Sequence, residues 1–220
     1  MSASPNKIRI DIVSDVVCPW CIIGFKQLEE ALSRLEGEVE AEIHWHPFEL
    51  NPMMPAEGQE LREHMTEKYG TNREQSDAAR ARLTAVGESL GFSFNFYEGQ
   101  RIYNTFPAHQ LLKWAEQQGK QSELEMALFE SYFSHEESVG DEKALAEVAG
   151  RVGLDVEEAA AVLEDGRFAG DVREHQRFWL SKGIQAVPSF ILDGRYLIPG
   201  AQDPDVFVAA IEKLAYERTP

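Results

Sequence analysis

The chain has 220 residues, a formal net charge of −17 at pH 7 and a sequence pI near 4.7. Nucleic acid and anionic membrane surfaces both repel so acidic a chain, so neither is expected as a partner. A hydrophobic content of 43% can fill a substantial core, and no apolar run reaches the roughly eighteen residues of a membrane-spanning helix.

The first residues, Met1 to Lys7, lack the basic segment followed by an apolar segment that is typical of a secretory signal. We therefore expect a soluble protein of the cytoplasm. The chain has two cysteines, Cys18 and Cys21. In a reducing compartment, such a close pair is more typical of catalysis or redox sensing than of a structural disulfide.

The cysteine pair follows a predicted strand and begins a predicted helix. Residues 8–13 alternate and are rich in β-branched side chains, which predicts a strand. Pro19 suits the first helical turn, where its missing N–H needs no partner. Gly37 is expected to end the helix. The buried face of this helix is expected to contain the apolar residues at three- and four-residue steps: Phe25, Leu28, Leu32 and Leu35.

The start of a helix suits thiol chemistry. Free backbone N–H groups and the positive end of the helix dipole favour a thiolate over a thiol, so we predict Cys18 as the nucleophile. Cys21, one turn deeper, would be shielded from solvent and act as the resolving thiol. Cys18 would attack a substrate disulfide, and Cys21 would displace the substrate from the resulting mixed disulfide. The reverse steps would oxidise a substrate dithiol.

Two close cysteines also have three other interpretations: half of a zinc site, a structural disulfide, or plain buried residues. A zinc site needs two further ligands at familiar spacing. His44 and His46 lie on one face of a predicted strand, although paired histidines on a strand are more often ordinary surface or packed residues. The strand, motif and helix context favours redox chemistry, and no metal site is predicted.

A second strand is predicted at residues 39–50, which completes a β–α–β unit. From Asn51 onward, segments of helical period follow one another for about 130 residues, which predicts a helical insertion. Expected helix caps are Thr105, Asp141 and Asp155, the last with the spacing of a capping box. The expected buried faces are Leu61, Met65 and Tyr69; Leu83, Val86 and Leu90; Leu111, Leu112 and Ala115; Leu124, Leu128, Phe129, Tyr132 and Phe133; Leu145, Val148 and Val152; Val162 and Leu163; and Val172, Trp179 and Leu180.

Strand character returns at residues 186–192, and Asp193-Gly194 predicts a tight turn into a short strand at residues 195–198. A final helix is expected after Asp203-Pro204. The ends of the chain are therefore α/β and the middle is α. We divide the chain into a domain formed by residues 1–51 and 184–220 and an inserted helical domain of residues 52–183.

Together these features resemble the DsbA-like branch of the thioredoxin superfamily. The resemblance rests on a Cys-Pro-Trp-Cys motif after a strand, a long helical insertion, Val187-Pro188 at a later strand and a closing helix. Three short motifs resemble the bacterial FrnE-type oxidoreductases of that family: Phe48-Glu49-Leu50-Asn51-Pro52, Asn104-Thr105 with Ala108-His109, and Gly200-Ala201-Gln202. Each short motif is weak alone, whereas their order along the chain is specific.

The resemblance implies an α/β, thioredoxin-like fold in which a large all-helical insertion domain caps the active site. It implies that Pro188 is cis and that the backbone of Val187 binds an extended substrate; a proline at an ordinary strand start is the alternative. Pro19 and Trp20 would belong to the same substrate site. The implied partners are protein or peptide thiols and disulfides. No cofactor is implied except, in one alternative, glutathione as reductant or substrate. Both a monomer and a homodimer stay open.

The sequence departs from the family pattern in two places. Many thioredoxin-like enzymes keep a buried acid six residues before the first cysteine, where this chain has Ile12. Asp11 is expected to face away and Asp15 lies in the loop, so proton transfer to Cys21 would use water or a more distant acid such as Glu49. A surface or capping carboxylate is the alternative for Glu49. Some FrnE-type proteins carry further cysteines near the C-terminus, and this chain has none.

Two other functions stay open. Kappa-class glutathione transferases and 2-hydroxychromene-2-carboxylate isomerases share this architecture and bind glutathione, but usually carry serine at the position of Cys18. Asn104 and His109 are predicted to contact a small ligand from the helical cap, with a capping asparagine and a packed histidine as the alternatives. The other function is a chaperone-like peptide-binding module with incidental cysteines. The sequence leaves the direction of disulfide exchange open.

Overall fold

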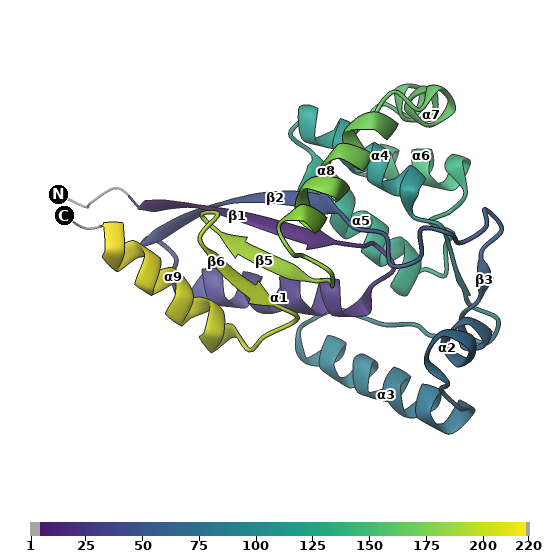
Figure 1. The fold of residues 1–220 in the computed structure, drawn as a ribbon, viewed down its shortest axis with the longest axis horizontal. Helices are drawn as coiled ribbons and strands as arrows, with labels where there is room; N and C mark the ends of the chain where they lie inside the picture. The colour runs from purple at the N-terminus through teal and green to yellow at the C-terminus, as the bar shows by residue number, and fades with distance from the viewer. Residues whose placement is uncertain (1–4, 219–220) are drawn as a thin grey trace.

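The computed structural model describes residues 5–218, with a sheet at one end and a group of helices at the other (Figure 1). The elements in chain order are β1 Asn6–Ser14, α1 Pro19–Arg34, β2 Val39–Pro47, β3 Gln59–Glu60, α2 Leu61–Tyr69, α3 Arg73–Ser89, β4 Arg101–Ile102, α4 Phe106–Gln117, α5 Gln121–Phe133, α6 Glu142–Arg151, α7 Val156–Asp165, α8 Ala169–Ser181, β5 Ser189–Leu192, β6 Tyr196–Pro199 and α9 Pro204–Arg218.

The main sheet has the strand order β2-β1-β5-β6, with β2 parallel to β1 and the other neighbours antiparallel. Helix α1 connects the two parallel strands, which confirms the predicted β–α–β unit. The predicted hairpin is also present, because Asp193 and Gly194 both have positive φ, at 51° and 66°, and β5 pairs with β6. Two boundaries differ from the prediction by three residues, since β2 ends at Pro47 and β5 begins at Ser189; the bounds of β1 and β6 differ by one or two residues.

Both faces of the sheet are covered by helices. On one face, Ile8, Ile10 and Ile12 of β1 are fully buried in a core that includes apolar residues of α1 and α9. On the other face, Val13 of β1 packs in a second cluster with Trp179 of α8. Successive side chains of a strand point to opposite faces, so β1 supplies both cores. The result is the predicted α/β architecture.

The segment between β2 and β5 is mainly helical, but it is not all-helical as predicted. Strands β3 and β4 form a small antiparallel ladder that pairs Gln59 with Ile102. Gly58 precedes it with φ +69°, and a Cβ there would lie 2.3 Å from the Ile102 carbonyl oxygen. Strands of two residues show no alternation in a sequence, so the pattern could not predict them. The division at residues 52 and 183 stays a prediction.

Two residues of the expected buried faces are exposed: Tyr69 at 59% and Leu180 at 50%. In α2 the buried residue is His64 instead. In α8, Val172 and Trp179 are buried, and Leu180 lies one residue further around the helix. A helix that buries only a narrow stripe leaves the residue next to that stripe in solvent.

The helix caps are largely those predicted. Asp141 and Asp155 each accept a hydrogen bond from the backbone N–H three residues on, at 2.8 and 2.9 Å. Thr105 is the N-cap residue of α4, but its side chain makes no cap hydrogen bond. Asn104 Oδ1 accepts the hydrogen bond from Phe106 N instead, at 2.9 Å. The side chain that bonds the first backbone N–H of α4 is therefore that of Asn104, one residue before the predicted cap.

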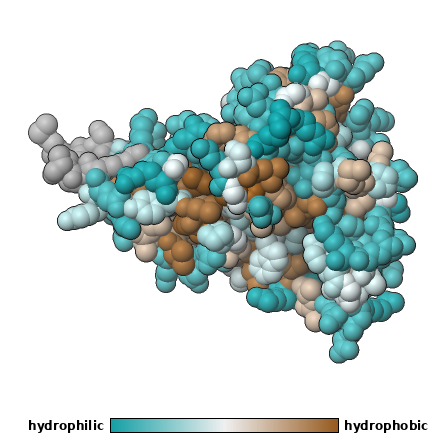
Figure 2. Space-filling view, in the orientation of Figure 1, coloured by the Kyte–Doolittle hydropathy of each residue, from teal (hydrophilic) through white to brown (hydrophobic). Residues whose placement is uncertain are grey.

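The surface is polar over most of the face that Figure 2 shows, and apolar residues gather over β5 and β6. Leu197 of β6 is 52% exposed. The exposed apolar residues of this face therefore lie mainly over the sheet.

Among the described residues, no helix has the length and apolar character needed to cross a bilayer.

Candidate active site

Cys18 and Cys21 lie at the start of α1, directly after the turn that follows β1. Cys18 is the N-cap residue, with φ −93° and ψ 110°, and Pro19 is the first helical residue. Cys21 N donates to Cys18 O at 3.0 Å, which places the two side chains one turn apart. Both are free thiols; Cys18 is 5% exposed and Cys21 is fully buried. The two cysteines therefore occupy an outer and an inner position.

The structure brings a distant segment of the chain to Cys18. The Val187 carbonyl oxygen lies 3.9 Å from Cys18 Sγ, although 169 residues separate them in the sequence. The Val187–Pro188 peptide bond is cis, and Pro188 is buried just before β5. The start of α1 and the segment before β5 thus form one site.

Trp20 is the most open residue of the motif, with 37% of its surface exposed. The guanidinium of Arg82, on α3, lies 5.5 Å from the centre of its ring. This distance is typical of a cation–π interaction. Helix α3 therefore contributes a positive charge beside the cysteine motif.

Cys21 is in contact with polar groups despite its full burial. Burial raises the pKa of the Cys21 thiol well above its usual range, and a hydrogen bond with Cys18 raises this pKa further. Interactions with the Asp15 backbone and the Ser14 hydroxyl lower the pKa of Cys21, but they are weaker influences. Cys21 is therefore a neutral thiol near pH 7, with Ser14 as a polar neighbour.

Next to Cys21 lies a buried polar cluster made of Ser14, Asp15, His109 and Glu125, each at most 3% exposed. Ser14 Oγ donates to Glu125 Oε1 at 2.8 Å. His109 Nε2 lies 2.9 Å from the Phe48 carbonyl oxygen and 3.5 Å from Asp15 Oδ1. The end of β1, the loop after it, α4 and α5 therefore place two carboxyl groups and an imidazole in one water-excluded region.

His109 lies inside this cluster, away from solvent. Burial opposes the charged imidazole, but the hydrogen bond with Asp15 and the negative charges of Asp15, Glu125 and Glu49 raise the pKa of His109 above its usual value. The ring bonds to the Phe48 carbonyl, which is a packed arrangement. Contact between His109 and a ligand stays a prediction.

Asn104 connects two loops. Its Nδ2 donates to the Met54 carbonyl oxygen at 3.2 Å, and its Oδ1 accepts from Phe106 N. The side chain thus holds the loop after β2 against the start of α4, which is the capping alternative. Contact between Asn104 and a ligand likewise stays a prediction.

Glu49, the acid named as a proton-transfer candidate, faces α8. It forms an ion pair with Arg173 and accepts a hydrogen bond from Gln176 Nε2 at 2.8 Å. Arg173 also lies 3.8 Å above the ring of Phe106. Glu49 therefore joins the loop after β2 to α8, and the geometry gives it no hydrogen bond to Cys21.

The two histidines of β2 have acidic partners. His46 Nε2 lies 2.7 Å from Asp11 Oδ1, and His44 Nε2 lies 2.8 Å from Glu42 Oε1. Within residues 5–218, no group of three or more histidine, cysteine and acidic side chains is arranged to hold a metal ion. The histidines are thus accounted for as packed and surface residues.

The sequence analysis missed Ser14 and Glu125. A signal for Glu125 exists, because it lies four residues before Phe129 on a helix whose Leu124, Leu128 and Phe129 are all buried. A charged residue on an apolar helix face is unusual and needs a partner. For Ser14 no pattern in the sequence indicates a role.

Comparison with known proteins gives a match over most of the chain. Residues 9–212 match the family model of the DSBA-like thioredoxin domain. The uncharacterized protein YwbO of Bacillus subtilis is 30% identical over 205 residues, which cover 93% of this chain and 96% of that protein. A solved structure of a probable DsbA oxidoreductase from Streptomyces coelicolor is 35% identical, with a TM-score of 0.91 and coverage of 97% of this chain and 92% of that chain.

More distant structures share the fold. The cytosolic disulfide reductase DsbM from Pseudomonas aeruginosa is 18% identical with a TM-score of 0.65, and covers 95% of this chain and 99% of its own. A 2-hydroxychromene-2-carboxylate isomerase is 15% identical with a TM-score of 0.69, covering 95% and 97%. Both likenesses show the fold alone. With the family model matched from β1 to α9, the chain belongs to the family of proteins with a DSBA-like thioredoxin domain.

Proposed function

We propose that this protein is a thiol–disulfide oxidoreductase that exchanges disulfides with protein or small-thiol substrates through Cys18 and Cys21. The observation that carries the proposal is the position of the pair. Cys18 begins α1 beside the Val187 carbonyl, and Cys21 lies one turn further inside. The start of a helix favours the thiolate, which is the attacking form of cysteine.

In the proposed reaction, the Cys18 thiolate forms a bond to one sulfur of a substrate disulfide, and the other substrate sulfur leaves as a thiolate. Cys21 then loses its proton and attacks Cys18, so that a Cys18–Cys21 disulfide forms and the second substrate thiolate leaves. The substrate disulfide is reduced to two thiols and the cysteine pair is oxidised. The same steps in reverse oxidise a substrate dithiol. The Val187 backbone beside cis-Pro188 would bind an extended substrate.

The first prediction concerns the two cysteines. Cys18→Ser is expected to reduce exchange with a peptide that contains one disulfide to the uncatalysed rate, because it removes the nucleophile. In Cys21→Ser the reaction is expected to stop at a mixed disulfide between Cys18 and the substrate, because the resolving thiol is missing. Mass spectrometry detects this species. Ser33→Ala, on the exposed side of α1, is the control and should exchange at the normal rate. Normal activity of Cys18→Ser would favour the peptide-binding alternative.

The direction of exchange follows from the reduction potential of the pair. A titration against glutathione buffers, read by thiol labelling and mass, measures that potential. Thioredoxin and DsbA differ by about 150 mV with the same cysteine spacing, so the value distinguishes a reductase from an oxidase. A pair that forms no disulfide in any buffer would rule out the proposed function.

Glutathione is included in the proposal as a small-thiol partner. The Arg82 guanidinium beside Trp20 supplies a positive charge near Cys18 for a substrate carboxylate. The DsbM structure from Pseudomonas aeruginosa with GSH shares the fold, at 18% identity and a TM-score of 0.64. The isomerase alternative instead predicts turnover of a small aromatic substrate with glutathione. Location in the cytoplasm and the oligomeric state stay predictions.

A further inference from the structure

Resolution of a mixed disulfide requires Cys21 to lose a proton that solvent cannot take directly. Cys21 is 0% exposed, and burial raises its pKa well above the usual range. The attacking species must be the thiolate. A proton acceptor inside the protein is therefore needed next to this sulfur, and Ile12, six residues before Cys18, is apolar and 0% exposed, so it cannot serve.

The structure places a buried hydroxyl and a buried carboxyl group, joined by a hydrogen bond, beside Cys21. Ser14, at the end of β1, has a hydroxyl that interacts with the Cys21 sulfur and lowers the pKa of that thiol. The same hydroxyl donates to Glu125 Oε1 at 2.8 Å. Glu125 is 1% exposed and belongs to α5, in the helical part of the molecule. A serine hydroxyl both donates and accepts, so it can pass a proton from the thiol to the carboxylate.

The surroundings of Glu125 suit reversible proton transfer. Burial raises the pKa of Glu125 to about 7, the charge of His109 on α4 and the Ser14 hydrogen bond lower it, and the charge of Asp15 after β1 raises it. Lys113 of α4 and His46 of β2 line the same cavity as Glu125, while α6, also packed on α5, buries only apolar side chains. A group that titrates near neutral pH can both accept and return a proton.

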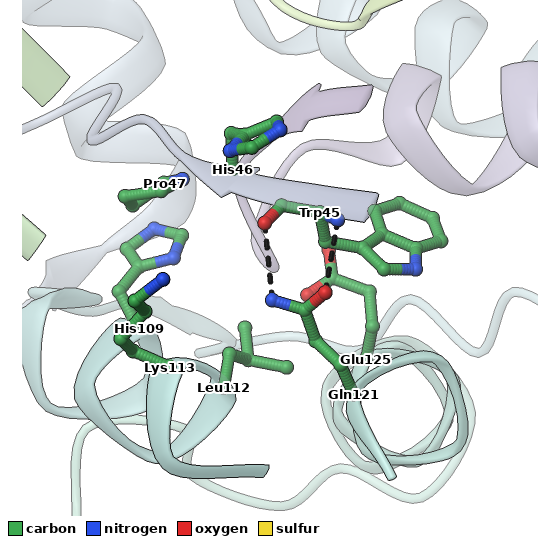
Figure 3. Close-up of a pocket in the computed structure, with 8 residues that line it drawn as sticks. All are labelled: Trp45, His46, Pro47, His109, Leu112, Lys113, Gln121 and Glu125. Atoms are coloured by element: carbon green, nitrogen blue, oxygen red, sulfur yellow. Dashed lines mark hydrogen bonds between the residues drawn. The ribbon is translucent and has the colours of Figure 1, made fainter. Parts of the chain in front are cut away.

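Glu125 also has a connection toward solvent. It lines a cavity of about 10 Å³ together with His109, Lys113 and Leu112 (Figure 3). This volume is about the smallest that can hold one water molecule. The Lys113 side chain is 17% exposed, so the far side of the cavity lies near the surface. The cavity therefore offers a proton on Glu125 a route toward solvent.

We propose that Ser14 and Glu125 form a proton relay that deprotonates Cys21 during resolution and reprotonates it in the reverse reaction. The relay rests on the proposed function. In the resolving step the Cys21 proton moves to Ser14 Oγ while the Ser14 proton moves to Glu125, and the Cys21 thiolate bonds to Cys18. The Cys18–substrate bond breaks, and the substrate leaves as a thiolate that takes a proton from solvent. Glu125 then releases its proton through the cavity.

The test separates the two exchange steps with glutathione disulfide as the probe. Reduced protein is mixed with the probe, and samples are quenched with acid at intervals. Mass spectrometry then measures how much protein carries the mixed disulfide. The mixed disulfide on Cys18 rises as Cys18 attacks and decays as Cys21 resolves it. Glu125→Gln keeps the shape and hydrogen bond of a neutral Glu125, and Ser14→Ala removes the hydroxyl. Glu130→Gln, an exposed glutamate on the same helix, is the matched control.

Both relay variants are expected to form the mixed disulfide at a normal rate and to resolve it about a hundredfold more slowly, the usual contribution of a general base. In the unmodified protein the resolution rate should rise through pH 7 with the ionisation of Glu125. In Glu125→Gln that rise should be absent. The control should match the unmodified protein in both phases, and circular dichroism and the thermal midpoint verify that each variant is folded.

Unchanged resolution and an unchanged pH profile in folded variants would overturn the relay while leaving the cysteine chemistry intact. Equal slowing of formation and resolution would also overturn it, because the defect would then lie in the shape of the site. Absence of both the mixed disulfide and the Cys18–Cys21 disulfide in the unmodified protein would instead refute the proposed function. The failures of the two proposals are therefore distinguishable.

Discussion

Asp11 is a buried acidic residue on the sheet face that α8 covers, and it bonds His46 and Arg9. Its Oδ1 lies 2.7 Å from His46 Nε2 and 2.6 Å from the nearest guanidinium nitrogen of Arg9, and the residue is 4% exposed. Burial alone would oppose ionisation, but the hydrogen bonds from His46 and Arg9 outweigh it and hold the pKa of Asp11 well below its usual range. The His46 ring in turn packs 4.8 Å from the ring of Trp179 on α8.

A lowered pKa in the folded state predicts a pH-dependent contribution to stability. That contribution is complete above the ordinary carboxyl pKa of about 4 and is lost as the pH falls through the folded value. Asp11→Asn is therefore expected to lower the free energy of unfolding by about 1.5–3 kcal/mol near neutral pH, and by progressively less in acid.

Urea unfolding measured from neutral pH down to about pH 3 checks the Asp11 prediction. Glu40→Gln, in an exposed ion pair on β2, is the control and should change the free energy of unfolding by less than about 1 kcal/mol. A loss in Asp11→Asn that is the same at every pH would contradict the assigned role of the charge.

Helix α1 approaches β5 closely because Gly24 has no side chain. A Cβ at Gly24 would lie 3.0 Å from Phe190 Cζ and 3.3 Å from Ala201 Cα. Phe190 is fully buried and packs against Phe207 of α9, with ring centres 4.9 Å apart. The helix that carries the cysteines is therefore set against the sheet by a contact in which a methyl group would force its neighbours to shift.

Gly24→Ala is expected to lower the free energy of unfolding by about 1–3 kcal/mol, since an added methyl in a packed core forces side chains and backbone to shift. Gly170→Ala in α8 is the matched control, because a Cβ there meets nothing within 4 Å. The control should raise stability by about 0.4–1 kcal/mol through the unfolded state. Thermal and urea unfolding measure both, and a neutral Gly24→Ala would contradict the close approach.

At the scale of the whole molecule, Gln121 joins the helical part to the sheet. Strand β2 lies at an edge of the sheet, so no strand pairs with its outer side. At Trp45 a side chain forms hydrogen bonds with the outward-facing backbone groups instead. Gln121 Oε1 accepts from Trp45 N, and its Nε2 donates to Trp45 O, both at 3.0 Å (Figure 3). The first residue of α5 thus satisfies the backbone of β2, and the same helix carries Glu125 to the cysteines.

Gln121→Ala leaves a buried N–H and a buried C=O of Trp45 without partners. Each unsatisfied group costs about 1–3 kcal/mol, so a large loss of stability is expected. Gln117→Ala, at an exposed site at the end of α4, is the control and should be near neutral. Urea unfolding followed by tryptophan fluorescence and by circular dichroism measures the loss. A Gln121→Ala variant as stable as the control would contradict this link.

Much of the fold is predictable because its signals are local. The alternation at Ile8, Ile10 and Ile12, the Asp193-Gly194 turn and the Asp141 cap each depend on neighbouring residues, and the structure has all of them. The prediction that Tyr69 is buried was wrong, because a helical period identifies one face of a helix but does not show what covers that face. The two-residue ladder of β3 and β4 leaves no pattern at all.

The sequence by itself determined where the cysteine pair lies, because a strand, a turn and a helix that begins at Pro19 are consecutive in the chain and locally encoded. Only the tertiary structure decided what surrounds the pair. Val187 reaches Cys18 across 169 residues, and Glu125 reaches Ser14 across 111. These contacts depend on how α5 and β5 pack against β1 and α1, and packing between distant segments leaves no spacing that a single sequence reveals.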